Sequence, residues 1–125
     1  MSDEYLNQFL KGLRDLAQGF EDASEVGPQT RSRVGDTPLH IAVIQGDVRA
    51  MKLLLDAGAD IHALGETGYT ALHYAVAHGR PEAVRALLER GADTQLCSGI
   101  GETPNELAQH FDNDEIKTLL HGRLA

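Results

Sequence analysis

The feature that most constrains the fold is a stretch that occurs twice, 33 residues apart. Residues 35–47 read GDTPLHIAVIQGD and residues 68–80 read GYTALHYAVAHGR. When residues 35–64 are laid over 68–97 without a gap, thirteen positions are identical, and both copies contain GAD. A further step of the same length reaches GETPNELA at residues 101–108, which keeps Gly101, Thr103, Pro104 and Ala108 in the frame. A fixed period of tens of residues is typical of stacked supersecondary units.

Each unit predicts two helices followed by a loop. Thr37 precedes Pro38, so threonine can cap a helix whose first position is proline, where the missing N–H costs nothing. Apolar residues at helical spacing lead from there to Gly46, and a second helix is predicted over about residues 48–56. Gly58 suits the left-handed position after that helix. The following GADIHALGETG predicts an extended excursion with turn residues before the next threonine.

The two ends of the chain depart from this pattern. The apolar residues Tyr5, Leu6, Phe9, Leu10, Leu13 and Leu16 predict an N-terminal helix, capped by Asp3 and ended by Gly19, over the first full unit. Residues 19–32 are expected to form a loop. In the third unit Asn105 and Glu106 replace the Leu-His pair, and His121 replaces the leucine of the other units. This unit is therefore expected to be a cap.

These motifs resemble the ankyrin repeat. The matching residues are Thr37-Pro38-Leu39-His40, Thr70-Ala71-Leu72-His73, Thr103-Pro104 and both GAD blocks, over roughly residues 32–122. The resemblance implies an all-α solenoid of stacked antiparallel helix pairs with β-hairpin fingers at right angles. A single domain, 1–125, is expected, with an N-terminal capping helix and loop (1–31), two repeats (32–64 and 65–97) and a C-terminal capping repeat (98–125).

Composition narrows the classes of partner. The formal net charge of −8 opposes binding to nucleic acids and, more weakly, to an anionic membrane surface. No apolar run approaches the roughly 20 residues of a membrane span, and no signal-peptide pattern is present. Cys97 is the only cysteine, so an internal disulfide is excluded and a cytoplasmic location is expected.

Histidines and the cysteine are the candidates for chemistry. His40 and His73 could be bases or metal ligands, or could hydrogen-bond the backbone beside their own fingers; the resemblance favours the latter, since histidine is usual there. Neither has a partner at zinc-ligand spacing. Cys97 could be a nucleophile with His78 or His110 as base, but it lacks an oxyanion loop. No catalytic residue, metal or cofactor is therefore expected.

The resemblance implies binding through finger tips and the inner helix surface, where residues that differ between units are informative. The candidate partner-binding residues are Arg33, Val34, Asp36, Ile44, Gln45, Glu66, Thr67, Tyr69, His78, Ile100, Glu102, His110 and Phe111. Asp36, Glu66 and Glu102 would place one carboxylate on each finger and orient a basic partner. Tyr69 is typical of an interface anchor. The alternative is that these charges only solubilise the fingers and that Phe111 plugs the cap.

Two classes of function follow. The first is a non-enzymatic protein–protein interaction module that masks, inhibits or regulates a protein partner with a basic surface. A small acidic chain of this format also suits a bacterial toxin-neutralising immunity protein. The second, less favoured, is a metal-binding protein or enzyme that uses His40, His73, His78 and His110. The chain is expected to be a monomer or a weak homodimer through its N-terminal helix.

Overall fold

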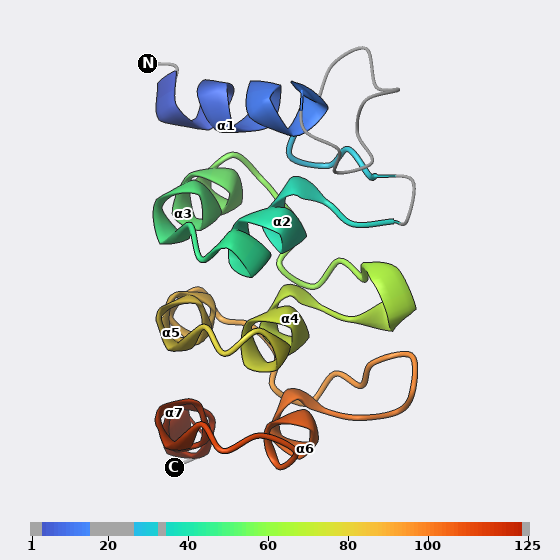
Figure 1. Ribbon diagram of the computed structural model, residues 1–125, viewed down its shortest axis with the longest axis vertical. Coiled ribbons are helices and arrows are strands. Elements are labelled where there is room, and N and C mark those ends of the chain that lie inside the picture. Colours follow the sequence, from blue (N-terminus) through green and yellow to red (C-terminus); the bar gives the residue numbers. More distant parts are fainter. Residues whose placement is uncertain (1–3, 16–26, 33–34, 124–125) are drawn as a thin grey trace.

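The computed structural model describes residues 4–15, 27–32 and 35–123, and it shows helical units stacked in one column (Figure 1). The elements are α1 (Glu4–Asp15), α2 (Pro38–Gln45), α3 (Val48–Asp56), the short 3-10 helix η1 (Glu66–Gly68), α4 (Ala71–Ala77), α5 (Pro81–Glu89), α6 (Pro104–Ala108) and α7 (Asp114–Arg123). Helix α1 lies at one end of the column, and the pair α6 and α7 lies at the other.

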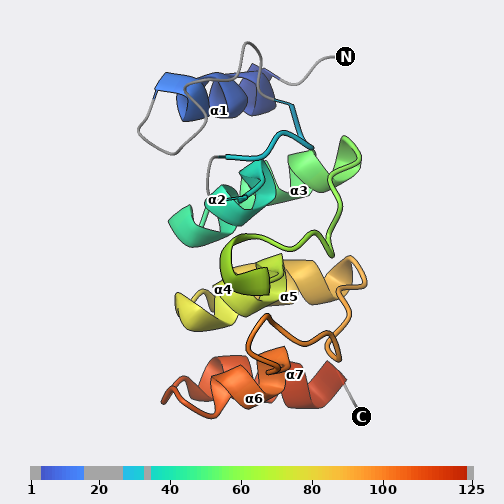
Figure 2. The ribbon, with the colours of Figure 1, turned by 90° about the vertical axis from the view of Figure 1, so that its right-hand side faces the viewer.

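Helices α2 and α3 begin and end where the sequence predicts. Proline opens α2 after Thr37, and Gly46 ends it with φ of 73°, a left-handed conformation that glycine adopts at little cost. The predicted second helix over 48–56 is confirmed as α3. Helices α5 and α7 begin one and two periods later, at Pro81 and Asp114. The inner helices α2, α4 and α6 thus stand beside the outer helices α3, α5 and α7 (Figure 2).

One continuous apolar core joins the units. Small residues at one register, Ala42, Ala75 and Ala108, are buried and let successive inner helices pack closely. Larger residues at one register of the outer helices, Leu54, Leu87 and Leu120, are buried as well. Each helix pair therefore buries its apolar face against the next pair rather than within itself alone.

Helix α1 covers the first pair, as its apolar pattern predicts. Leu13 is buried against Ile41 of α2. The hydroxyl group of Tyr5 donates to Asp47 at 2.8 Å, and the guanidinium of Arg49 lies 4.3 Å from the centre of the Tyr5 ring. The predicted cap Asp3, Leu16, Gly19 and the first part of the 19–32 loop lie outside the described residues. A turn closes between Gly27 and Thr30.

Loops project from the column on the side of the inner helices (Figure 1). In each of the three fingers the tip closes by a backbone hydrogen bond: Ser32 N–H to Asp36 at 2.7 Å, Gly65 N–H to Tyr69 at 2.8 Å, and Ser98 N–H to Glu102 at 2.7 Å. Within 4–15, 27–32 and 35–123 no segment forms a β-strand. The fingers are closed by backbone hydrogen bonds there, and the expected β-hairpins are not shown.

Candidate functional site: fingers and inner helices

His40 and His73 join the inner helices α2 and α4 to the finger that follows each of them. Nδ1 of His40 accepts the N–H of Thr37 at 3.0 Å, and Nε2 lies 3.1 Å from the Ala63 carbonyl. Nδ1 of His73 accepts the N–H of Thr70 at 3.2 Å, and Nε2 lies 2.8 Å from the Glu102 carbonyl. Because Nδ1 is an acceptor in both rings, Nε2 carries the proton and donates to the carbonyl.

These bonds refine the structural interpretation of the histidines. Each ring holds the next finger as well as its own helix start, whereas the sequence suggested its own finger alone. Burial lowers the pKa of both His40 and His73, which keeps the rings neutral. In the third unit, Glu106 accepts the Thr103 N–H at 3.0 Å, and this bond lowers the pKa of its carboxyl group. The Glu106 carboxylate thus takes the bond at the helix start that the histidine rings take in the other two units.

The arrangement gives little support to the metal or enzyme alternative. Both nitrogens of His40 and of His73 are engaged by protein groups. Within the described part of the chain, no group of three or more His, Cys, Asp or Glu side chains is placed to hold a metal ion. Cys97 is exposed, and no bond joins it to His78 or His110 among the described residues.

The expectation that Asp36 is an exposed acidic tip is wrong. The residue is only 6% exposed. Its Oδ1 accepts the hydroxyl of Tyr74 at 2.7 Å and the N–H of Glu66 at 3.0 Å. Burial and the Asp36 carboxylate together raise the pKa of Tyr74. Two donors from the next unit compensate the carboxylate for its lost hydration, so Asp36 joins fingers instead of facing a partner.

The other two acidic positions differ from each other. Glu66 is exposed on the second finger. Glu102 is half-buried, and its Oε2 lies 2.7 Å from Nε2 of His110. Its carboxylate therefore faces the end of inner helix α6. The expected row of three acidic tips is reduced to one free carboxylate, that of Glu66.

Tyr69 combines a structural role with partial exposure. Its ring stacks on His73 with centroids 5.4 Å apart and meets the edge of Tyr74 at 5.6 Å. The residue is half-buried. A substitution at Tyr69 therefore removes packing from two rings of the fold, and it does not report on binding alone.

Most remaining candidates are exposed on one side of the column. Gln45, His78, His110 and Phe111 are exposed at the ends of the inner helices, and Ile44 is half-buried there. Ile100 is 69% and Phe111 39% exposed, so the ring of Phe111 does not plug the core. Arg33 and Val34 lie outside the described residues. We call the described set the finger–helix surface: Ile44, Gln45, Glu66, Thr67, Tyr69, His78, Ile100, Glu102, His110 and Phe111.

Two features of this side are not evident from the sequence. Thr67 has φ of 59°, a left-handed conformation that is costly for a β-branched residue, and its carbonyl accepts the N–H of Gly99 at 2.9 Å. Leu64 is 50% exposed between the fingers. The periodicity does not mark Leu64, because the aligned position in the next unit holds Cys97.

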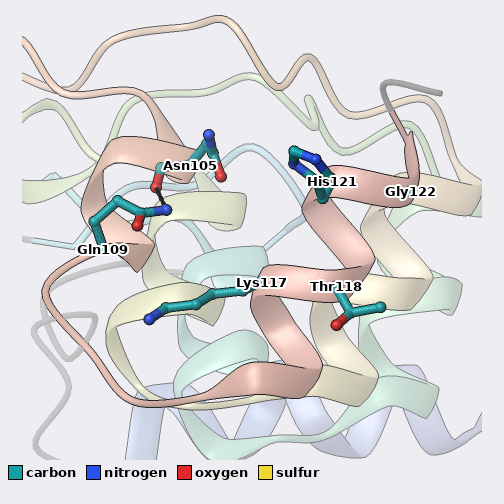
Figure 3. A pocket seen from close by; sticks show the side chains of 6 residues that line it. All are labelled: Asn105, Gln109, Lys117, Thr118, His121 and Gly122. Atoms are coloured by element: carbon teal, nitrogen blue, oxygen red, sulfur yellow. Dashed lines mark hydrogen bonds between the residues drawn. The ribbon is translucent and has the colours of Figure 1, made fainter.

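A separate hollow of about 510 Å³ lies on the α6–α7 face at the end of the column (Figure 3). It is lined by Asn105 of α6, by Gln109 directly after α6, and by Lys117, Thr118, His121 and Gly122 of α7. The Gln109 amide donates to the Asn105 carbonyl at 3.3 Å. Polar side chains suit a face that no described element covers.

Comparisons with known proteins agree with the stacked architecture. A family model described as ankyrin repeats in three copies matches residues 5–97, from α1 to the loop before the third finger tip. No curated protein matches the chain. Among the described helices, none has the length and apolar character needed to cross a membrane.

Proposed function

Since the chain belongs to the ankyrin-repeat family, whose repeats mediate protein–protein interaction, we propose that it binds a protein partner through the finger–helix surface. Binding would mask, inhibit or regulate that partner without catalysis by this chain. Membership of the family supports the interaction role, and the chemistry of the exposed side chains supports the finger–helix surface as the binding site.

One observation carries the proposal: most of the candidate residues that differ between units are exposed along the same side, whereas the repeated histidines and the repeated apolar residues of the inner helices are buried. His40 and His73 repeat and are 1% and 0% exposed. Gln45 and His78 occupy one register and differ, and both are exposed. Apolar Ile100 and aromatic Phe111 are also exposed beside them. Exposed apolar groups rimmed by polar ones are typical of interaction surfaces.

The charge of the chain favours a basic partner. A net charge of −8 speeds encounter with a positively charged surface at low salt. The exposed carboxylate of Glu66 lies on the second finger, where it would orient such a partner. Three fingers and the adjacent helix ends would bury about 600–900 Å² on each side, which is enough for a specific complex.

A toxin-neutralising immunity protein is one specific form of this function. The acidic charge supports it, because many proteins that act on nucleic acids are basic and an acidic protein can cover their binding surface. Two observations would support this form. One is a gene for a secreted toxin beside the gene for this chain, and the other is protection of cells from that toxin when this chain is expressed. If expression of the chain does not protect cells, regulation of another basic protein is the form of the function that stands.

The experiment compares partner affinity for two pairs of substitutions. Glu66→Ala with Ile100→Ser removes exposed groups from two fingers and leaves the packed ring of Tyr69 intact. We expect at least a tenfold loss of affinity for the protein captured from native lysate, without a change in Tm. The control, Lys52→Ala with Glu89→Ala on the outer helices, should bind as the unmodified chain does. Equal affinity of both pairs would contradict the proposal.

A further inference from the structure

Two successive turns between helices are built alike but filled differently. Position 80 in the turn before α5 is arginine, and position 113 in the turn before α7, one period later, is asparagine. These turns lie one above the other in Figure 2. Nε and Nη2 of Arg80 donate to the Ile44 carbonyl at 3.2 and 2.8 Å, across the junction between α2 and α4. The arginine side chain thus occupies the groove at the end of α2.

Asn113 does not fill the equivalent groove at the end of α4. Its Oδ1 accepts the N–H of Ile116 at 3.1 Å and so caps α7. A Cβ built on Gly46 would lie 3.2 Å from Nη1 of Arg80, whereas one on Gly79 would lie 3.8 Å from Nδ2 of Asn113. The hollow beside Arg80 measures about 200 Å³, and the hollow beside Asn113 measures about 460 Å³.

This larger hollow, the arginine groove, is lined by Val76, Ala77, His78, Gly79, Phe111, Asp112, Asn113 and Asp114. The Ala77 carbonyl corresponds to the Ile44 carbonyl that Arg80 binds. No group in the described residues donates to it, because Pro81 has no N–H and the Arg80 N–H donates to Ala75. A hydrogen-bond acceptor is therefore available where a guanidinium is bound one unit earlier.

The groove also carries two carboxylates at positions where the preceding unit has uncharged residues. Asp112 and Asp114 stand where the preceding unit has Gly79 and Pro81, and both are exposed without an ion pair to a described residue. Phe111 is 39% exposed on the same wall. Carboxylates accept guanidinium hydrogen bonds, and an aromatic face attracts a guanidinium or covers its aliphatic stem.

We propose that the arginine groove receives an arginine side chain of the protein partner, in the manner in which Arg80 occupies the preceding junction. The guanidinium donates to the Ala77 carbonyl and pairs with Asp112 and Asp114, while Phe111 covers its stem. This inference rests on the proposed function and names the chemistry of the partner. Arginine fits better than lysine because its planar fork can serve the carbonyl and the carboxylates together.

The direct test titrates isotope-labelled protein with the peptide acetyl-Gly-Arg-Gly-amide and follows backbone amide shifts by NMR. The expected shifts cluster at residues 76–79 and 111–114. The same peptide with citrulline, a neutral isostere of arginine, should bind at least tenfold more weakly. Equal shifts with both peptides, shifts elsewhere on the chain, or tighter binding of spermidine than of the arginine peptide would overturn the proposal.

Two sets of variants localise the effect. Asp112→Asn with Asp114→Asn should weaken the arginine peptide at least fivefold, while Glu4→Gln with Glu89→Gln, an equal change of net charge at remote positions, should not. Asn113→Arg should fill the groove from within and abolish peptide binding. Asn113→Met loses the same cap of α7 without supplying a guanidinium, so it should still bind. Circular dichroism confirms that each variant is folded, and binding by Asn113→Arg would contradict the assignment.

Measurements with the captured partner separate this inference from the proposed function. If Asp112→Asn with Asp114→Asn leaves partner affinity unchanged while Glu66→Ala with Ile100→Ser weakens it, the arginine groove is refuted and the finger–helix surface stands. If both pairs weaken binding, both proposals are supported. If neither does, both fail.

Discussion

The hydroxyl group of Tyr74 donates a 2.7 Å hydrogen bond to the buried carboxylate of Asp36, which belongs to the preceding finger. The same Oδ1 accepts the backbone N–H of Glu66, so one carboxylate joins two fingers and helix α4. A Cβ at Gly65 would collide with this oxygen. The close approach of the Gly65 backbone to the Asp36 carboxylate is thus part of the same junction between units.

This junction predicts strong coupling between Asp36 and Tyr74. Asp36→Ala should cost about 2–3 kcal/mol of unfolding free energy, because it leaves the Glu66 N–H without its acceptor and the buried hydroxyl with only the Glu66 carbonyl, 3.5 Å away. Tyr74→Phe should cost about 1–2 kcal/mol, since the carboxylate keeps one donor. A double-mutant cycle by urea unfolding should give a coupling of about 1 kcal/mol or more. Strictly additive effects would show that the bond contributes nothing to stability.

The buried histidines predict a loss of stability in mild acid. Burial lowers the pKa of His40 and His73 in the folded chain below the ordinary 6.5. As pH falls below about 6.5, the unfolded chain takes up protons that the folded chain does not, so unfolding is favoured. The histidine contribution is complete above that pH and declines below it. Urea unfolding between pH 7.5 and 5 measures this decline.

His73→Gln isolates the contribution of one ring. Glutamine at this position can still accept the Thr70 N–H, as Glu106 does for Thr103, but it does not titrate in this range. The variant should be less stable at pH 7.5, because the bond to the Glu102 carbonyl is changed, and its stability should fall less steeply between pH 6.5 and 5. A slope as steep as that of the unmodified chain would mean that His73 does not contribute to the pH dependence.

The left-handed backbone at Thr67 predicts a stabilising substitution. Thr67→Gly should raise the unfolding free energy by about 1 kcal/mol, because glycine adopts φ of 59° without the Cβ penalty. The adjacent Gly68→Ala is the control, and it should destabilise, since its Cβ would lie 2.6 Å from the Gly99 backbone nitrogen. Thermal unfolding of both variants makes the comparison. A lower Tm for Thr67→Gly would contradict the account of strain at this tip.

The sequence was sufficient for features that depend on local chemistry and period. The Thr-Pro starts, the left-handed glycines and the apolar registers recur because each unit solves the same packing problem, and α2 to α7 follow them. Asp36 was misjudged because its burial depends on Tyr74, which is distant in the chain. A turn carboxylate without that partner would face water.

The surface was harder to predict than the core. Exposure of Gln45, His78 and Ile100 follows from the repeating frame, but pairing of Glu102 with His110 depends on how a finger meets the end of a helix. The arginine groove can be recognised only when the positions of Arg80 and Asn113 are compared in the structure. Their different lengths matter only once the carbonyls of Ile44 and Ala77 are seen as equivalent.

The central claim is that a protein partner docks on the finger–helix surface, and photo-cross-linking in native extract tests it most directly. A photoreactive residue is placed at Gln45 or Ile100 on this surface, and at Lys52 or Glu89 on the exposed outer helices as controls. We predict that the first two positions capture the same protein and that the controls do not. Capture of that protein from the outer helices alone, or equally from all four positions, would contradict the claim.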